Sequence, residues 1–399
     1  MSTNHLPLLI VGCGIGGMTT ALALAQKGVD SIVLEQAEEF REMGAAIQML
    51  PNFFGMFEIL GIVETIEKNV LYIDNLLLFD GVTGQEVMRM PYGKNLKARF
   101  KYPHAIIHRE VLLGALIKEC EKYDQIKMFT SCRVIDFEEI DDKVIVKTEK
   151  GETFEGVALI AAEGIRSKIR NRIVGDGKPL ASSVVYRATI KKDKMPVHLQ
   201  HNDVIHWMGP NAYVIYYPVQ KDGDIFYNLL AIHRSSKQHE PEDSIPDLED
   251  LYAHFAGFQP NVVEIIDLVD KSRIWMSCDR EPVSQWSKGL VTLLGDAAHP
   301  MRATLTQGAG MAIEDAIVLA NKIALCKGDY KAAFEAYQEE RYLRCARVVL
   351  TSRFISDLEQ ATGLTRELRN QVLSQWSADQ MYDYFEWVLT PINKATDSI

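Results

Sequence analysis

The chain has 399 residues, of which 47% are apolar and 24% charged, and its formal net charge at pH 7 is −11. This composition is typical of a globular protein, excludes extensive disorder and, at this length, favours two structural domains. The negative charge argues against nucleic acid or an anionic membrane as the main partner, because both require clustered Lys and Arg.

The scattered cysteines predict a reducing environment. No two of them form a CxxC pair, and His198 and His201 lack cysteine or carboxylate partners, so we expect no metal site. No apolar stretch reaches the ~18 to 20 residues of a membrane-spanning helix, and the N-terminus lacks the basic region of a signal peptide. We therefore expect no membrane association and a cytoplasmic location. The cysteines are Cys13, Cys120, Cys132, Cys278, Cys326 and Cys345.

The first 35 residues predict a βαβ unit that binds a dinucleotide. A strand over 8–11 and a strand over 31–34 flank a helix, and Glu35 ends the second strand, where a carboxylate can accept hydrogen bonds from a ribose. The turn before the helix holds backbone NH groups that can bind a pyrophosphate. NAD and FAD both fit this unit. Its G-x-G-x-x-G glycines are Gly12, Gly14 and Gly17.

The middle of the chain alternates between strand and helix patterns before it becomes rich in strands. Between about residues 180 and 275 the pattern indicates strands rich in aromatic residues, separated by turns and one acidic loop over 239–250. Before that region we expect a helix from Pro51 to Gly61, strands over 71–92, a helix over 109–123, a hairpin over 134–154 and a buried strand over 157–161.

The segment that distinguishes FAD from NAD lies between residues 290 and 316. A strand over 290–294 ends at Asp296, and small residues lead to a helix that starts near 307–310. Asp296 could bind a sugar-alcohol chain, and NH groups at the helix start could stabilise negative charge on a reduced ring. The alternative is an Asp helix cap beside a glycine turn. The chain from 330 onward is mostly helical and charged.

These patterns predict an α/β fold with a Rossmann-like FAD-binding domain, an inserted, mostly antiparallel β-sheet substrate domain, and C-terminal helices. The expected ranges are 1–180 for the FAD-binding domain, with 71–100 contributing to the substrate side, 181–275 for the substrate domain, 276–345 for completion of the FAD-binding domain, and 346–399 for the helices.

Four ordered motifs resemble the single-component FAD-dependent aromatic hydroxylases, especially those acting on salicylate, 3-hydroxybenzoate and 6-hydroxynicotinate. The motifs are GCGIGG with Glu35, IHREVLLGAL at Ile107 to Leu116, AAEGIRSKIR at Ala161 to Arg170, and GDAAHP at Gly295 to Pro300. The resemblance covers essentially the whole chain. It implies that NADH or NADPH reduces FAD, that O2 then forms a C4a-hydroperoxide, and that a small hydroxylated aromatic or heteroaromatic acid is hydroxylated by a monomer or homodimer.

The resemblance also implies a set of cofactor contacts. The adenosine and pyrophosphate half would contact Gly12, Gly14, Gly17, Glu35, Gln36, Arg109 and Val134. The remainder of FAD would contact Ala45, Ala46, Glu163, Asp296, Gly308 and Ala309, with Glu163 serving nicotinamide binding too. Two positions depart from the family pattern: Glu163 stands where Asp is usual, and Ala46 stands where Gly is usual. Both departures lie near expected cofactor surfaces.

Tyr213 and Tyr217 are the candidate catalytic residues, since they stand four apart and share one face of a strand. The resembling hydroxylases that act on 3-hydroxybenzoate and 6-hydroxynicotinate have a His where Tyr213 stands. A tyrosine with an ordinary pKa of ~10 is a poor base, so another group is expected to take the proton. Both tyrosines could instead be sheet-core aromatics.

Several charged residues have weaker claims. Arg187 and Arg302 are candidate anion contacts, because a guanidinium can bind a carboxylate through two hydrogen bonds. His299 is expected to pack at the flavin rather than act as a base. His206 and His233 are interpreted as core or edge histidines with satisfied hydrogen bonds.

Three other functions remain open on the sequence alone. An NAD-dependent dehydrogenase would share the βαβ unit but would not need Asp296 and its helix start. A flavin monooxygenase of the same fold could inactivate a larger, antibiotic-like substrate, whereas a halogenase is disfavoured because no W-x-W-x-I-P type segment is present. A non-catalytic flavin redox sensor would use its oxidation state to shift a binding surface.

Overall fold

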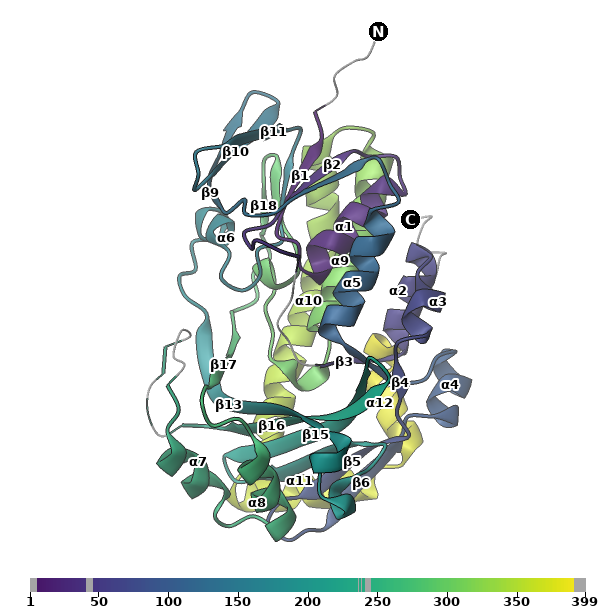
Figure 1. Cartoon of the computed structure of the whole chain (residues 1–399), viewed down its shortest axis with the longest axis vertical. Helices are drawn as coiled ribbons and strands as arrows, with labels where there is room; N and C mark the ends of the chain where they lie inside the picture. Colours follow the sequence, from purple (N-terminus) through teal and green to yellow (C-terminus); the bar gives the residue numbers. More distant parts are fainter. Residues whose placement is uncertain (1–5, 41–45, 236, 238, 241–244, 391–399) are drawn as a thin grey trace.

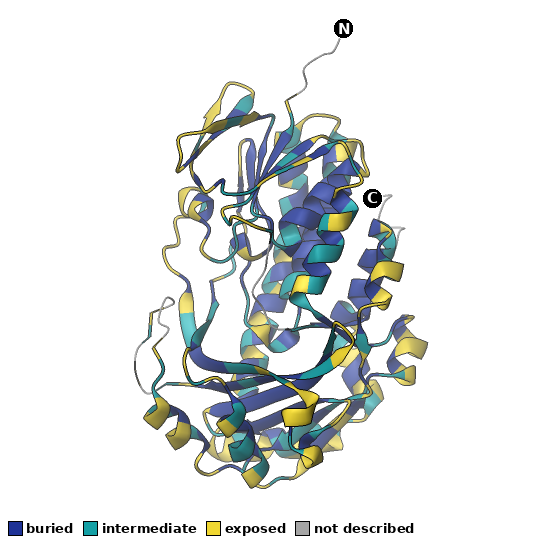
Figure 2. Ribbon diagram, viewed as in Figure 1, coloured by how far each residue is buried: buried dark blue, intermediate teal, exposed yellow. Residues whose placement is uncertain are grey.

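Two large sheets lie at opposite ends of the molecule, and one long helix, α10 (Tyr330–Glu359), runs alongside both (Figure 1). The computed structural model describes residues 6–40, 46–235, 237, 239–240 and 245–390. In this part of the chain, both large sheets are buried, while exposed residues gather on the outer helices and on the hairpin at one end (Figure 2).

The first sheet has six strands. All neighbouring pairs are parallel except the edge pair β18 and β19. The LLIV run of β1 is buried throughout, as expected for a central strand of a covered parallel sheet. In spatial order the strands are β18 (Ser287–Lys288), β19 (Val291–Leu293), β12 (Leu159–Ala161), β1 (Leu8–Val11), β2 (Ser31–Leu34) and β8 (Ile126–Phe129).

Three helices pack together beside this sheet, and a small antiparallel sheet packs against its strand β1. The helices are α1 (Ile15–Ala25), α5 (Arg109–Cys120) and α9 (Gly308–Cys326), and the small sheet consists of β9 (Val134–Ile140), β10 (Lys143–Thr148) and β11 (Thr153–Gly156). A short helix, α6 (Lys168–Ile173), follows β12. The strands and helices expected for this half are confirmed.

The second sheet has seven strands, antiparallel throughout except between β14 and β5. Strands β5 and β6, which come before residue 100, pair into the sheet formed by the later strands. The division into domains at the expected boundaries stays a prediction. In spatial order the strands are β17 (Trp275–Asp279), β13 (Leu180–Lys191), β16 (Asp224–His233), β15 (Ala212–Lys221), β14 (Val204–Gly209), β5 (Asn75–Asp80) and β6 (Glu86–Pro91).

Helices cover both faces of this second sheet, which explains why β15 is buried on both of its sides. One face packs against α7 (Leu248–Phe255) and α8 (Pro260–Leu268), and the other against α10, α11 (Gly363–Gln375) and α12 (Ala378–Leu389). The expectation of only strands and an acidic loop over 180–275 was therefore wrong at α7 and α8.

The acidic loop conceals the start of α7. Asp247 caps this helix by accepting a hydrogen bond from the Asp250 backbone NH at 3.1 Å, and Glu249 and Asp250 lie in its first turn. Acidic residues are favoured there by the helix dipole. Leu251 and Phe255, spaced four apart, then pack into the sheet. The expected loop was therefore wrong for residues 248–250, where the acidic run enters the first turn of a helix.

The remaining elements connect the two sheets. They are β3 (Ala46–Met49), β7 (Ala105–His108) and β4 (Leu71–Tyr72), which pair in that order, and α2 (Pro51–Leu60), α3 (Val63–Glu67) and α4 (Lys94–Phe100). Four 3-10 turns complete them: η1 (Lys192–Lys194), η2 (Val197–Leu199), η3 (Gly295–Ala297) and η4 (Ala303–Leu305). Within the described residues, every helix is too short or too polar to cross a membrane.

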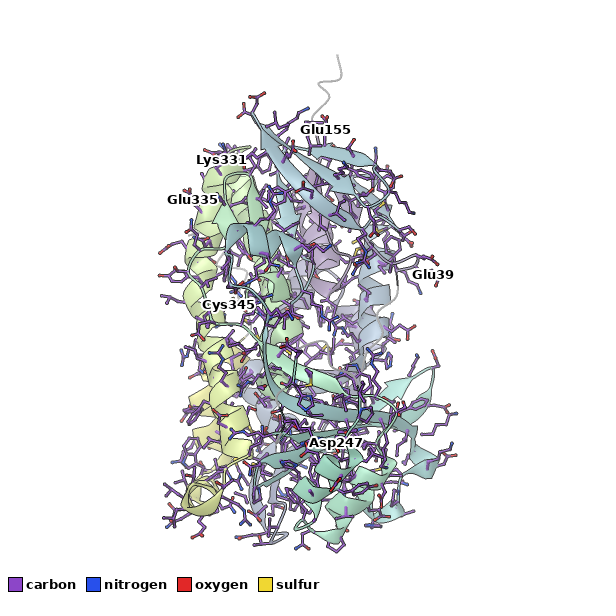
Figure 3. The ribbon with its side chains drawn as sticks, turned by 90° about the vertical axis from the view of Figure 1, so that its left-hand side faces the viewer. Glu39, Glu155, Asp247, Lys331, Glu335 and Cys345 are labelled. Carbon is purple, nitrogen blue, oxygen red and sulfur yellow. The ribbon has the colours of Figure 1, made fainter. Side chains whose placement is uncertain are left out.

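Charged side chains gather on the periphery, as a side view shows for Glu155, Lys331 and Glu335 (Figure 3). Cys345 of α10, labelled in the same view, is instead fully buried. The six cysteines form no disulfide with one another.

Candidate active site between the two sheets

A cleft of about 970 Å³ separates the two large sheets. Its walls combine the strand ends of the first sheet, the N-terminus of α9 and the inner face of the second sheet. Eleven of the expected cofactor residues line it: Gly12, Gly14, Glu35, Gln36, Ala46, Arg109, Val134, Glu163, Asp296, Gly308 and Ala309. Ala45 lies outside the described residues, and Gly17 packs behind the wall.

The three glycines of the first turn have different structural roles. Gly12 has φ +105°, and a Cβ there would meet the Ala162 carbonyl oxygen at 2.3 Å. A Cβ on Gly17 would meet the Gly12 carbonyl oxygen at 1.9 Å, so α1 can approach β1 only with glycine at that position. Gly14 has no atom within 4 Å of a Cβ position and faces the cleft. It therefore leaves room for a ligand.

Glu35 is fixed at the end of β2 by two backbone donors. The Cys13 NH donates to one carboxylate oxygen and the Ala37 NH to the other, each at 2.8 Å. This arrangement holds the carboxylate at the rim of the cleft, next to the glycine turn and Gln36. The second lone pair of each oxygen can accept a ribose hydroxyl.

Two helix N-termini open onto the cleft without side-chain caps. Neither Gly14, the N-cap of α1, nor Gln307, the N-cap of α9, makes a side-chain cap hydrogen bond. The first NH groups of a helix have no partner within it and carry partial positive charge. Both ends can therefore bind anionic or electron-rich groups: a pyrophosphate at α1, and a flavin pyrimidine edge at Gly308 and Ala309.

Asp296 in η3 lies beside the start of α9, with Oδ1 3.9 Å from a Cβ position on Gly308. The Asp296 side chain is exposed to the cleft. The cleft is deep enough that desolvation raises the pKa of Asp296, although the positive charge of Arg109 opposes this shift. A carboxylate in this position can bind ligand hydroxyls from the wall of the cleft.

Glu163 follows β12 and is already engaged by protein groups. One of its carboxylate oxygens accepts hydrogen bonds from the Ser167 hydroxyl at 2.6 Å and the Ile169 backbone NH at 3.1 Å. Desolvation raises the pKa of Glu163 despite these donors. The longer Glu side chain thus reaches the N-terminus of α6, and its expected nicotinamide contact stays a prediction.

Buried ion pairs that the sequence analysis missed hold the cleft wall from behind. The guanidinium of fully buried Arg170 donates to the Ala297 carbonyl at 2.9 Å and to Asp176 at 2.6 Å, which ties α6 to η3. His299 binds Asp315 at 2.6 Å, and Asp315 in turn accepts from Arg341 at 2.7 Å. The contact of Arg170 with Ala297 spans 127 residues and that of Arg341 with Asp315 spans 26, so no local sequence pattern predicts either of them.

The far end of the cleft is made of side chains on the second sheet. Tyr217 of β15 donates a hydrogen bond to the Ala46 carbonyl at 3.2 Å and accepts one from Asn228 of β16 at 2.7 Å. Burial raises the pKa of Tyr217 to about 12, although Asn228 and Arg187 oppose the shift. Tyr213, on the same strand face, is buried outside the described lining of the cleft, and its catalytic role stays a prediction.

Two arginines and one histidine complete this end. Arg187 is largely buried, and its Nε has no hydrogen-bond partner among the described residues. Desolvation lowers its pKa, as does the nearby charge of Arg109. Arg302 pairs with Asp279 at 3.2 Å, and His206 with Glu359 of α10 at 2.7 Å. A cationic wall with an unpaired donor suits a small anionic ligand.

A second cavity of about 470 Å³ adjoins the first, and Gln48, His206, Thr304 and Thr306 line both. Its other walls are largely apolar and come from β5, β6, α11 and α12. The two cavities therefore meet at the end of the cleft formed by the second sheet, beside His206.

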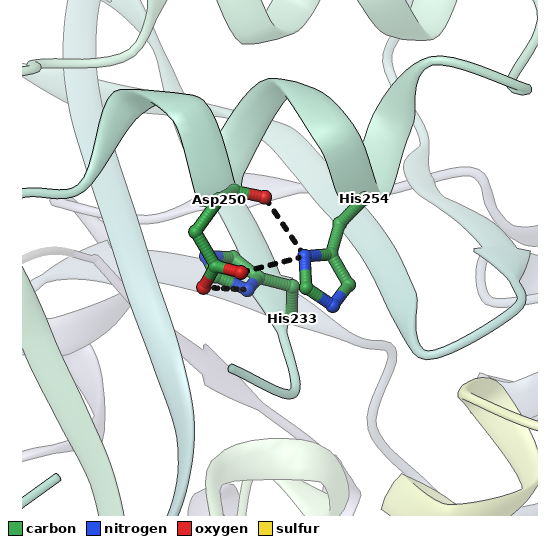
Figure 4. Close-up of side chains that lie close together, drawn as sticks. All are labelled: His233, Asp250 and His254. Atoms are coloured by element: carbon green, nitrogen blue, oxygen red, sulfur yellow. Dashed lines mark hydrogen bonds and ion pairs between the residues drawn. The ribbon is translucent and has the colours of Figure 1, made fainter. Parts of the chain in front are cut away.

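Two clusters in the described residues group possible metal ligands, and each has a structural explanation. His299, Asp315 and Cys345 belong to the buried network behind η3. His233, at the end of β16, lies beside Asp250 and His254 of α7 (Figure 4), and none of the three lines the cleft. There, His254 Nδ1 donates to the Asp250 carbonyl at 2.8 Å, which occupies that nitrogen.

The uncapped helix ends, the open space at Gly14, the fixed Glu35 and the Asp296 carboxylate in the cleft wall fit an FAD molecule. Comparison with known proteins agrees. A family model described as an FAD binding domain matches residues 5–352. The chain is 37% identical to a 3-hydroxybenzoate 6-hydroxylase from Polaromonas naphthalenivorans over 97% of both chains, and 36% identical to 3-hydroxybenzoate 6-hydroxylase 1 from Aquipseudomonas alcaligenes over 96% of both. Klebsiella pneumoniae HpxO, solved with FAD and uric acid, superposes with TM-score 0.83 at 25% identity, covering 98% of each chain.

Proposed function

Because the chain belongs to the family of single-component FAD-dependent aromatic hydroxylases, we propose that it uses NADH or NADPH and O2 to hydroxylate a small hydroxylated aromatic acid. The observation that carries this proposal is the single cleft, which has backbone donors for a dinucleotide at one end and Tyr217 and Arg187 at the other. An aromatic ring bound at the second end would lie between Tyr217 and Arg187.

Bound FAD would supply the redox chemistry, namely hydride acceptance from the nicotinamide and activation of O2. The chain's own residues would bind the cofactor, orient the substrate and shield both from bulk water. The NH groups of Gly308 and Ala309 would favour negative charge on the reduced ring system. Tyr217 would donate its O–H to the substrate oxygen in place of the Ala46 carbonyl, while Asn228 holds the Tyr217 oxygen at 2.7 Å. The second sheet would exclude bulk water.

The proposed substrate class is a hydroxybenzoate or a hydroxypyridine carboxylate. Arg187 supports the carboxylate, because a buried guanidinium with an unpaired Nε gains most from a planar anion. The names of the relatives support the hydroxylated ring. The adjoining apolar cavity favours one alternative, a bulkier phenol whose substituent extends past His206.

NADH and NADPH oxidation should be followed with the FAD-loaded protein against a panel of hydroxybenzoates, hydroxypyridine carboxylates and bulkier phenols. We expect at least one small acid to stimulate oxidation and to yield a product heavier by one oxygen atom. Stimulation by bulky phenols alone would favour the alternative. A protein that retains no FAD and oxidises no nicotinamide with any compound would contradict the proposal.

A further inference from the structure

Hydroxylation of a phenol requires a group that takes the phenolic proton, and neither candidate tyrosine can do so at neutral pH. Burial raises the pKa of Tyr217 to about 12 and that of Tyr213 further, so both phenols stay protonated. The carboxylates that line the cleft, Glu35, Glu163 and Asp296, belong to its cofactor end. Neither the candidate tyrosines nor the carboxylates that line the cleft therefore supply a base at this position.

The second sheet brings an imidazole to this position from a neighbouring strand. His206 of β14 pairs directly with Ile215 of β15, and Ile215 stands between Tyr213 and Tyr217 on the same strand face. His206 is 7% exposed and lines both cavities where they meet. Among the described residues that line the cleft it is the sole histidine. The one side chain of the described cleft lining that carries an imidazole nitrogen thus lies at the substrate end.

The imidazole is held by a carboxylate on its far side. Its Nδ1 lies 2.7 Å from Oε1 of Glu359, which is 4% exposed and sits at the last turn of α10. No described residue makes a hydrogen bond to Nε2. An imidazole whose Nδ1–H is bound by a buried carboxylate presents its other nitrogen as an acceptor. This is the arrangement of a base and its orienting group.

We propose that His206, positioned by Glu359, accepts the proton of the substrate phenol; this rests on the hydroxylation proposed above. The phenolic O–H bond breaks, the electron pair stays on the oxygen, and a bond forms between the proton and Nε2. The phenolate directs electron density into the ring, which favours transfer of an electrophilic oxygen atom. When the ring regains aromaticity, its C–H proton passes to solvent water and the imidazolium returns its proton to the same oxygen, so the imidazole is regenerated.

The neighbouring groups explain why Glu359 matters. A protonated His206 would face the positive charges of Arg369 in α11 and of Arg302 before η4. The negative charge of the Glu359 carboxylate offsets this repulsion. The other buried oxygen of Glu359 has no partner in the described residues and is available to a water or ligand donor. The charged and titratable groups that face His206 are Glu359, Tyr213, Tyr217, Arg302, Arg369 and, across the second cavity, Tyr92 and Tyr384.

The test compares His206→Gln, Glu359→Gln and the control His198→Gln. His198 forms a surface pair with Glu264 at 3.0 Å, so the control removes an imidazole with a carboxylate partner away from the cleft. For each variant, FAD content, binding of 3-hydroxybenzoate and coupled product formation are measured from pH 6 to 9. The ultraviolet spectrum of the bound ligand reports its phenolate fraction without turnover.

We expect His206→Gln to retain FAD and to bind the ligand within a few-fold, but to lose about 10²- to 10³-fold in coupled hydroxylation at pH 7. The loss should shrink as pH rises towards the phenol's own pKa, and the bound ligand should lose its phenolate spectrum. Glu359→Gln should lose less and shift the acid limb of kcat/KM to lower pH, because the imidazolium loses its counter-charge. His198→Gln should match the parent protein.

An unchanged rate, pH profile and phenolate spectrum in His206→Gln would overturn the assignment while leaving the hydroxylase intact. A parent protein that turns over no phenol would instead contradict the proposed function. The two failures are therefore distinguishable.

Discussion

The two ends of the cleft are built from different parts of the polypeptide. At the cofactor end, the groups that face the ligand are backbone NH groups, glycines and two carboxylates fixed at strand ends. At the substrate end, they are side chains from β13, β14 and β15, supported by α10. A backbone-built site accepts little change because it depends on close approach, whereas a side-chain site can change ligand with a few substitutions. The same fold can thus keep FAD and exchange substrates.

The largest expected effect is at the cofactor end, in Gly17→Ala. The new methyl would lie 1.9 Å from the Gly12 carbonyl, so α1 must move away from β1, with an expected loss above about 3 kcal/mol in unfolding free energy and no retained FAD. The matched variant Gly14→Ala has free space and should fold with a near-normal Tm but bind FAD weakly. Thermal unfolding and flavin absorbance distinguish the two; equal behaviour would contradict the distinct roles.

A substitution at the substrate end should leave FAD in place. Arg187→Gln should raise the KM for a carboxylate-bearing substrate about 30- to 100-fold, because a charge-assisted hydrogen bond is worth roughly 2 to 3 kcal/mol. The control is Arg273→Gln, since the exposed Arg273 guanidinium also lies over the Trp275 ring, at 5.4 Å compared with 5.5 Å for Arg187. A phenol without a carboxylate should show no difference. A loss of FAD, or no change in KM, would refute the assignment.

Acid should destabilise the region of the second sheet around His233 more than the region around His299. Burial lowers the pKa of His233, in the second sheet, to about 4, so the folded state disfavours its charged form. This stability is present above the unfolded pKa of ~6.5 and falls as pH drops towards 4, by about 2 kcal/mol between pH 7 and 5. Burial opposes the charged form of His299, but the Asp315 carboxylate, 2.6 Å from its ring, overcomes burial and raises the pKa of His299, so its stabilising effect persists in acid.

Hydrogen exchange at pH 7 and pH 5 would follow the two regions separately. We expect β16 to lose protection in acid before α9 does, after correction for the intrinsic exchange rate. The variant His233→Gln should reduce the pH dependence in β16. Equal loss in both elements would contradict this difference.

The smallest expected effect is that of Tyr217→Phe. Removing the hydroxyl leaves Asn228 without its acceptor at 2.7 Å and removes the proposed substrate contact, so we expect about a tenfold loss in kcat/KM. FAD content should be unchanged. The variant Tyr216→Phe, on the opposite face of the same strand, serves as the control. A Tyr217→Phe enzyme with parental kcat/KM would exclude a role for the hydroxyl.

The cofactor end could be predicted because its geometry is encoded locally. Gly12, Gly14 and Glu35 follow a strand, helix and strand in close succession, and Asp296 ends another strand. The substrate end depends on which strands become neighbours, so the pairing of His206 with Ile215 and the contact of Glu359 with His206 could not be read from spacing. The interpretation of His206 as a core or edge histidine with a satisfied hydrogen bond agrees with its burial and its contact with Glu359. Its place at the cleft could not be predicted because Glu359 lies 153 residues away in the chain.

The most direct test of the account is turnover of the FAD-loaded protein with NAD(P)H, a hydroxybenzoate and isotopically labelled O2. We predict that one labelled oxygen atom enters the aromatic product and that nicotinamide oxidation, oxygen uptake and product formation agree in amount. Nicotinamide oxidation that yields only hydrogen peroxide with every small acid, or a product whose new oxygen comes from water, would contradict the central claim.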